Sequence, residues 1–129
     1  MELVTSMRRV REIMTRPKNL HVLTDIDNKE DYIPNPTWFY FSVGNGLVIY
    51  KPKGVCLELM TALEPSDIPK NPIKELHKQW LKMASLGYHT IYSIVHDKRL
   101  KVALMCRSAG MEKTINKESF SIYTKVIHG

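Results

Sequence analysis

The side chains that could support acid–base, nucleophilic or metal chemistry include His77, His89, His96, Cys56 and Cys106. A zinc site needs ligands at short, fixed spacing, such as two histidines four residues apart or a Cys-x-x-Cys pair, and these five residues show neither spacing. His96, Asp97 and Cys106 could be drawn as a carboxylate, imidazole and thiol set. Adjacent side chains at a strand end usually point apart, which argues against that set. We therefore expect no metal site and two reduced, buried cysteines.

Two lysines flank the start of a predicted helix. Asn71 and Pro72 are typical of the N-cap and the first helical position, and Lys70 and Lys74 stand on either side of them. A helix N-terminus carries unpaired N–H groups and a partial positive charge, so it attracts anions. The lysines therefore indicate a weak anion site, and the alternative is that they are two solvated side chains beside a cap.

The N-terminal half is predicted to contain one helix and an antiparallel meander. Apolar residues recur at three- and four-residue steps from Leu3 to Met14, which predicts a helix that ends before Pro17. Residues 19–37 are predicted as loop with one short extended piece at 20–23. Residues 38–43 and 47–51 form a predicted hairpin around Gly44-Asn45-Gly46, and 55–63 is the third strand.

The C-terminal half is predicted to alternate helices and strands. The helix that starts at Asn71 ends at Gly87, and its outward face includes Gln79. A strand at 90–95, a helix at 98–109 closed by Gly110, and strands at 111–115 and 120–127 follow. The residues predicted to point inward are Ile73, Leu76, Trp80, Met83 and Ala84 on the first helix and Leu100, Ala103 and Leu104 on the second.

Four aromatic residues in succession, Trp38, Phe39, Tyr40 and Phe41, occupy one predicted strand. Because side chains alternate across a strand, two of them face one side of the sheet and two face the other. An uncovered pair, either Trp38 with Tyr40 or Phe39 with Phe41, would be an interaction surface. Burial on both faces of the sheet is the alternative.

Length and composition indicate one domain over residues 1–129. The chain is 43% apolar and carries a formal charge of +6. No apolar run approaches the roughly 18 residues that cross a bilayer, so we expect no membrane insertion and no export signal. The positive charge predicts weak affinity for polyanions or nucleic acid, although the basic residues are spread along the chain.

The predicted order of elements resembles that of the GNAT (general N-acetyltransferase) fold. The strand ending Ala62-Leu63-Glu64-Pro65 is similar to the V-x-P ending of a central strand in that family, and residues 107–111, Arg-Ser-Ala-Gly-Met, resemble its closing K-L-G-F. The resemblance covers the last two-thirds of the chain and lacks a clear first strand. It implies an α+β domain with a mixed, mostly antiparallel central sheet and helices on both faces.

The same resemblance points to a lost acetyl-CoA loop. Active members carry R-x-x-G-x-G/A after the strand, whereas residues 66–74 here contain no glycine, and Asp67 would repel a phosphate. If acetyl-CoA binds at all, the implied cofactor residues are Leu63, Lys70, Asn71 and Lys74. The implied catalytic residues are Glu58 or Glu64 as base and Cys106 as acid, Cys106 standing where the family commonly has a tyrosine. Packing roles are the alternatives for Glu58 and Cys106.

Two functions follow as expectations. The first is a non-catalytic GNAT-like protein, similar in size and layout to small head-assembly or virion proteins of short-tailed phages. It would bind protein partners such as virion components, and would be found in the cytoplasm of a host cell or on the particle. The second is an acetyl-CoA-dependent N-acetyltransferase with a divergent pyrophosphate loop. A nucleic-acid-binding module is a third possibility that rests on charge alone.

Overall fold

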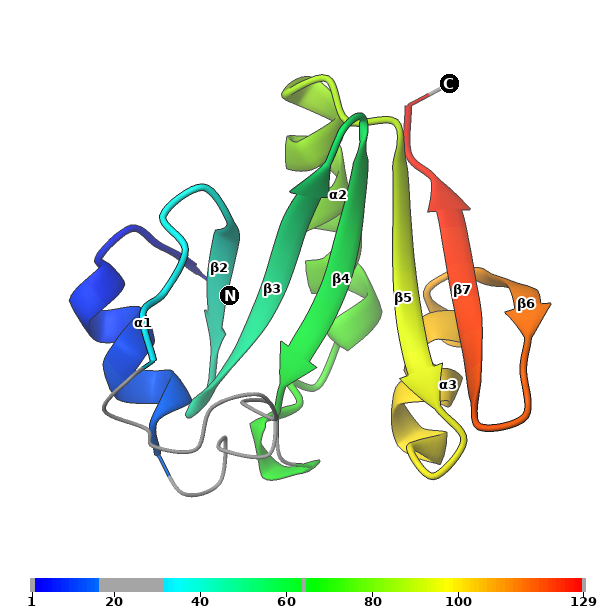
Figure 1. Ribbon diagram of the computed structural model, residues 1–129, viewed down its shortest axis with the longest axis horizontal. Coiled ribbons are helices and arrows are strands. Elements are labelled where there is room, and N and C mark those ends of the chain that lie inside the picture. The colour runs from blue at the N-terminus through cyan, green and yellow to red at the C-terminus, as the bar shows by residue number, and fades with distance from the viewer. Residues whose placement is uncertain (1, 17–31, 64, 129) are drawn as a thin grey trace. The chain divides into compact units, whose positions relative to one another are not determined.

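The computed structural model describes residues 2–16, 32–63 and 65–128, and its elements follow one another as β1, α1, β2, β3, β4, a short 3₁₀ turn, α2, β5, α3, β6 and β7 (Figure 1). Contacts divide the chain into two compact units. The N-terminal unit is residues 1–51 with 60–69, and the C-terminal unit is residues 52–59 with 70–129. The prediction of one domain over residues 1–129 stays a prediction. Most of the predicted loop at 19–37, including its extended piece at 20–23, lies outside the described residues.

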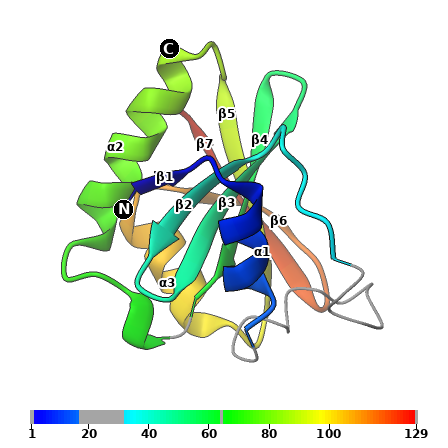
Figure 2. The same cartoon turned by 90° about the vertical axis from the view of Figure 1, so that its left-hand side faces the viewer.

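The N-terminal unit holds an antiparallel sheet in the order β1-β2-β3-β4. Its strands are β1 (Glu2–Val4), β2 (Phe39–Val43), β3 (Gly46–Lys53) and the last residues of β4 (Cys56–Ala62). Helix α1 (Met7–Met14) lies along β2 and β3 (Figure 2). The core between them consists of Val4, Val10, Ile13, Met14, Tyr32, Tyr40, Leu47, Ile49 and Ala62.

Strand β1 was not predicted, and the expectation that the helix begins at Leu3 is wrong. The helix begins after Ser6, whose hydroxyl accepts the Arg9 N–H at 3.3 Å as an N-cap. Leu3 instead pairs with Phe41 of β2. Its spacing from Met7 and Val10 suits a helix, but pairing with β2 makes it part of the edge strand of the sheet. Tertiary pairing outweighs a local pattern in so short a segment.

The aromatic run does not form an open interaction surface. Tyr40 is fully buried beneath α1, and Phe41 on the opposite face is also buried. Trp38 is partly buried, and the Lys51 ammonium lies 4.5 Å from its ring centroid. Burial on both faces, the alternative reading, is therefore correct for Tyr40 and Phe41. Burial raises the pKa of Tyr40, and its hydroxyl donates to the Asn35 carbonyl at 3.0 Å.

The predicted hairpin is confirmed, and a buried carboxylate secures its turn. Gly44 has a φ of 56°, which glycine adopts without strain. Asp67, in the 3₁₀ turn Pro65–Asp67, accepts the Asn45 N–H at 2.9 Å and is 8% exposed. Its carboxylate therefore serves the hairpin turn, which corrects the expectation that it is free to repel a phosphate.

The C-terminal unit holds strands in the order β4-β5-β7-β6. Strand β5 (Thr90–His96) pairs parallel to β4 and antiparallel to β7 (Phe120–Val126), which in turn pairs antiparallel with β6 (Glu112–Asn116). The parallel pair makes the sheet mixed. Helices α2 (Pro72–Ser85) and α3 (Leu100–Ser108) flank it, and His77 of α2 lies 2.8 Å from the Ala109 carbonyl at the end of α3.

The two helices follow the predictions to different degrees. In α2, the residues Leu76, Trp80 and Met83 are buried as predicted, but Gln79, predicted to face outward, is also buried. In α3 the predicted inward face is wrong, because Leu100 and Leu104 are 70% and 61% exposed. Cys106 is the buried residue of that helix. Both helices end at a glycine with positive φ, Gly87 at 97° and Gly110 at 95°, as predicted.

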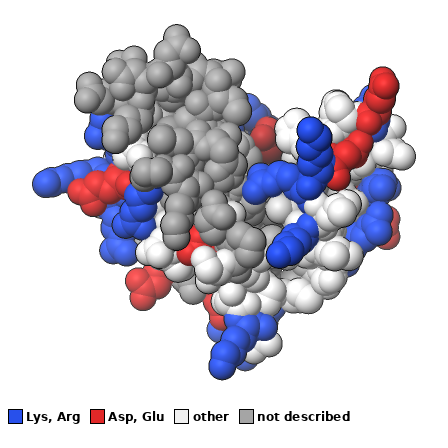
Figure 3. All heavy atoms as spheres, turned by 90° about the horizontal axis from the view of Figure 1, so that it is seen from below, with Lys and Arg blue, Asp and Glu red and all other residues white. Residues whose placement is uncertain are grey.

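On the face shown in Figure 3, lysines and arginines lie at several separate places, with acidic residues among them. This agrees with their spread along the sequence. Within the described residues, no helix is long and apolar enough to span a membrane.

Candidate functional site

The parallel ladder between β4 and β5 is short. Its pairs are Cys56↔Thr90, Leu57↔Ile91 and Glu58↔Tyr92, although β5 continues to His96 and pairs with β7 along its whole length. After the last pair, the Ser93 hydroxyl donates to the Leu59 carbonyl at 3.1 Å. We call this place, formed by Glu58, Leu59, Tyr92 and Ser93, the ladder end.

One face of the ladder end carries a carboxylate. The Tyr92 hydroxyl donates to Glu58 Oε1 at 3.3 Å, and both side chains are partly buried. Burial and the nearby Glu58 charge raise the pKa of Tyr92, so the phenol keeps its proton and remains a donor. This bond fixes one carboxylate oxygen and leaves the second oxygen able to accept a proton. The chemistry is that of a positioned general base.

The other face of the ladder end carries the thiol of Cys106, which contacts Ser93 and is 3% exposed. Burial raises the pKa of Cys106 to about 11. A free thiol has a pKa of roughly 8.5, so a thiolate leaving group would be a weaker base than the Cys106 thiolate. At 3% exposure the thiol is out of reach of a leaving group in the folded protein, which argues against the predicted acid role.

The start of α2 forms a basic surface groove of about 660 Å³, lined in part by Lys70, Asn71, Lys74 and Lys78. Lys78 lies 3.6 Å from Glu75, whereas neither Lys70 nor Lys74 has a carboxylate partner in the described part of the chain. The first backbone hydrogen bond of the helix runs from the Glu75 N–H to the Asn71 carbonyl. The backbone N–H groups before Glu75 therefore have no partner within the helix. We call this place the α2 groove. It is suited to a phosphate or carboxylate.

The comparisons with known proteins match this architecture. No family model and no curated protein sequence matches the chain. Among solved structures, a chimera of spermidine N-acetyltransferase SpeG from Vibrio cholerae and hSSAT matches with a TM-score of 0.65 at 13% identity, covering 98% of this chain and 96% of that one. The fold is that of the GNAT acetyltransferases.

Two further structures support the same fold. An acetyltransferase of the GNAT family from Listeria monocytogenes has a TM-score of 0.62 at 9% identity, covering 96% of this chain and 93% of that chain. A Bacillus subtilis acetyltransferase in complex with CoA has a TM-score of 0.60 at 11% identity, covering 97% of this chain and 96% of that chain. Identities this low establish the GNAT fold and leave the activity to be argued from the residues.

The predicted site residues fall into separate places on the GNAT fold. Lys70, Asn71 and Lys74 do line one groove, and Glu58 and Cys106 both lie beside Ser93, though on opposite faces of the sheet. Leu63 belongs to the N-terminal unit, where it packs close to Gly46. Glu64 lies outside the described residues. In the described ranges, no three His, Cys, Asp or Glu side chains are grouped to hold a metal.

Sequence reasoning did not find Tyr92 and Ser93. Both act through partners 34 positions away, Glu58 and Leu59, and those contacts depend on the parallel register of β4 and β5. A tyrosine and a serine in alternation on a strand carry no signal of that register. The sequence could have shown only which side chains of β5 point inward, because Ser93 alternates with the buried Ile91 and Val95.

Proposed function

We propose that the chain is a GNAT-fold protein that binds a partner or an anionic ligand and does not transfer an acetyl group. The observation that carries this proposal is the start of α2. Pro72 stands at the first helical position without an N–H, and the Asn71 side chain makes no cap bond. The sequence has no glycine between Gly54 and Gly87, so the backbone lacks the residues that let a loop close around a pyrophosphate.

The proton donor is the second part of the argument. An acyl transfer from a thioester needs the leaving thiolate to be protonated, and Cys106 holds its proton more tightly than a free thiol. Water would have to replace Cys106 as the proton donor to the leaving thiolate. The loss of both the phosphate loop and the donor fits a binding role better than catalysis.

The proposed partner is a virion component of a short-tailed phage. What supports this is the GNAT layout together with the missing loop, which resembles small head-assembly proteins of such phages. Capsid or portal genes beside the gene for this chain are the expected observation. A neighbourhood of metabolic genes would contradict this partner.

An acetyl-CoA-dependent N-acetyltransferase is the second candidate, and the Glu58–Tyr92 pair favours it. A carboxylate held by a phenol at the ladder end is a suitable base for removing a proton from an amine, directly or through water. GNAT-fold structures from Bacillus subtilis and Thermoplasma acidophilum are complexes with CoA, which supports a CoA site in this fold.

Titration with acetyl-CoA separates the two candidates. A ligand that binds the folded state must stabilise it. Because we propose that acetyl-CoA does not bind as a substrate, we expect no rise in melting temperature at sub-millimolar acetyl-CoA. Inorganic pyrophosphate serves as the probe of the α2 groove. The test variant is Lys70→Ala/Lys74→Ala, and the control variant is Lys82→Ala, which removes another exposed lysine of α2.

Stabilisation by acetyl-CoA that disappears in the Lys70→Ala/Lys74→Ala protein would place CoA in the α2 groove, and acetyl transfer to an amine would then overturn the non-catalytic proposal. Release of free CoA thiol in the presence of an amine would then identify the enzyme. Loss of that release in Glu58→Gln, with acetyl-CoA binding retained, would assign Glu58 as the base.

A further inference from the structure

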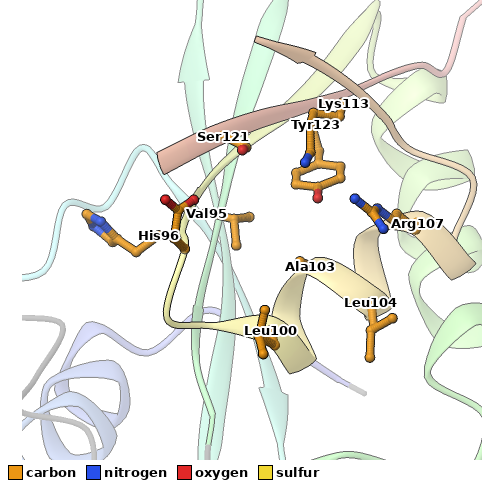
Figure 4. A pocket seen from close by; sticks show the side chains of 10 residues that line it. Val95, His96, Leu100, Ala103, Leu104, Arg107, Lys113, Ser121 and Tyr123 are labelled. Carbon is orange, nitrogen blue, oxygen red and sulfur yellow. The ribbon is translucent and has the colours of Figure 1, made fainter. Parts of the chain in front are cut away.

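A second cavity lies on the far side of α3 from its contact with α2, between that helix and β5, β6 and β7. Its volume is about 350 Å³, within the range of pockets that bind small molecules. Figure 4 shows α3 below and the strands above. Its apolar lining comes from Val95, Leu100, Ala103 and Leu104. We call it the α3 hollow. It includes neither the ladder end nor the α2 groove.

A phenol hydroxyl opens into the α3 hollow. Tyr123 of β7 is only 2% exposed, and its hydroxyl has no hydrogen-bond partner among the described residues. In Figure 4 this hydroxyl points from the strands toward Ala103 on α3. Because the hydroxyl opens into the hollow and has no protein acceptor among the described residues, it is available as a donor to a bound molecule. A ligand that supplies an acceptor atom would provide that partner.

Two cations lie beside the same tyrosine. The Arg107 guanidinium and the Lys113 ammonium each lie 6.0 Å from the centroid of the Tyr123 ring. Neither has a carboxylate partner in the described parts of the chain. Figure 4 shows both near the phenol, with His96 at the opposite end of the hollow. The end that holds Tyr123 is therefore positive and has a free donor, which is complementary to an anion.

Exposed leucines complete the chemistry of the α3 hollow. Leu100 and Leu104 are 70% and 61% exposed, one helical turn apart on the rim. A molecule with an apolar chain would cover part of their surface, and burial of apolar area is favourable. The hollow thus offers apolar side chains between two polar ends: the two cations and the phenol of Tyr123 at one end, and His96 with Asp97 at the other.

We propose that the α3 hollow binds an apolar molecule that ends in a single carboxylate, of the class of a medium-chain fatty acid. The carboxylate lies between Arg107 and Lys113 and accepts the Tyr123 hydroxyl proton in a hydrogen bond. The chain lies against Val95, Ala103 and Leu104. No bond is made or broken, and the site acts independently of any CoA binding.

Calorimetric titration of the full chain with octanoate at neutral pH tests this site. We expect one saturable site, and octan-1-ol and octylammonium should bind at least ten-fold more weakly because they lack the anion. Tyr123→Phe removes only the hydroxyl and should weaken octanoate by about ten-fold. Tyr92→Phe removes a phenol hydroxyl that is already bonded to Glu58, and it is the matched control that should leave octanoate binding unchanged.

A second variant tests the cavity itself. Ala103→Trp fills the α3 hollow from its helix wall and should abolish binding, and circular dichroism shows whether that variant is folded. Arg107→Met/Lys113→Met should abolish the preference for octanoate over octan-1-ol. The proposal is overturned if octan-1-ol or octylammonium binds as well as octanoate, or if folded Ala103→Trp binds octanoate normally. It is also overturned if 8-aminooctanoate, which has an ammonium group at the end of the chain away from the carboxylate, binds more tightly than octanoate.

Discussion

Helices α2 and α3 lie in the same unit and end in the same way, yet they use their apolar residues differently. Helix α2 buries Leu76, Trp80 and Met83, whereas α3 buries Cys106 and leaves Leu100 and Leu104 at the surface. The first arrangement is what stability alone favours. The second retains exposed apolar surface next to a cavity, and such surface commonly marks a binding site. Both helices border a cavity, the α2 groove and the α3 hollow, but only α2 also buries a run of large apolar side chains.

The largest expected effect lies in α2. Met83 is fully buried, so Met83→Ala removes apolar contacts and leaves a cavity. We expect a loss of about 3 kcal/mol in the free energy of unfolding, measured by urea denaturation. A loss below about 1 kcal/mol would show that α2 is not the better anchored helix.

The two helix ends should respond alike. Gly87→Ala and Gly110→Ala each force a side chain into the left-handed region, and at neither position does a Cβ meet another atom closer than 3.7 Å. We therefore expect only the backbone cost, about 1–2 kcal/mol each, in urea denaturation. A much larger cost at Gly110 than at Gly87 would show that the end of α3 has a constraint that α2 lacks.

The buried residue of α3 makes that helix sensitive to alkaline pH. Because the folded pKa of Cys106 is raised to about 11, its thiol ionises first in the unfolded chain. Its stabilising contribution is complete at neutral pH and is lost as the pH rises toward 11. We expect roughly 1 kcal/mol less stability at pH 10 than at pH 8 from this group alone. Denaturation of Cys106→Ala should lack that part of the decline.

The smallest expected effect is at the surface of α3. Leu104 is mostly exposed, so Leu104→Gln should change the free energy of unfolding by less than about 0.5 kcal/mol. A destabilisation comparable to that of Met83→Ala would mean that Leu104 packs in the core in solution. That result would remove the contrast between the helices.

The same contrast explains which parts of the fold could be predicted. Asn71-Pro72 marks the start of α2, and its apolar residues fit one face, so its position and burial follow from the sequence. In α3 every residue from 102 to 106 is apolar, so periodicity does not select a face. Leu100, Leu104 and Cys106 were all expected inside, and of these three only Cys106 is buried.

The candidate site was predictable only where one segment contains it. Lys70, Asn71 and Lys74 are neighbours in sequence and share a groove, as expected. The Tyr92–Glu58 and Ser93–Leu59 bonds, and the meeting of Arg107 and Lys113 over Tyr123, join segments whose register no local pattern specifies. The α3 hollow was missed for this reason.

The short parallel ladder has a consequence for hydrogen exchange. From Thr90 to Tyr92, β5 has strand partners on both sides, but from Ser93 to His96 its described ladder is with β7 alone. Successive amides of a strand point alternately to its two neighbours. Beyond Tyr92, slowly exchanging amides that face β7 should therefore alternate with faster ones, so a single strand has a uniformly protected first half and an unevenly protected second half.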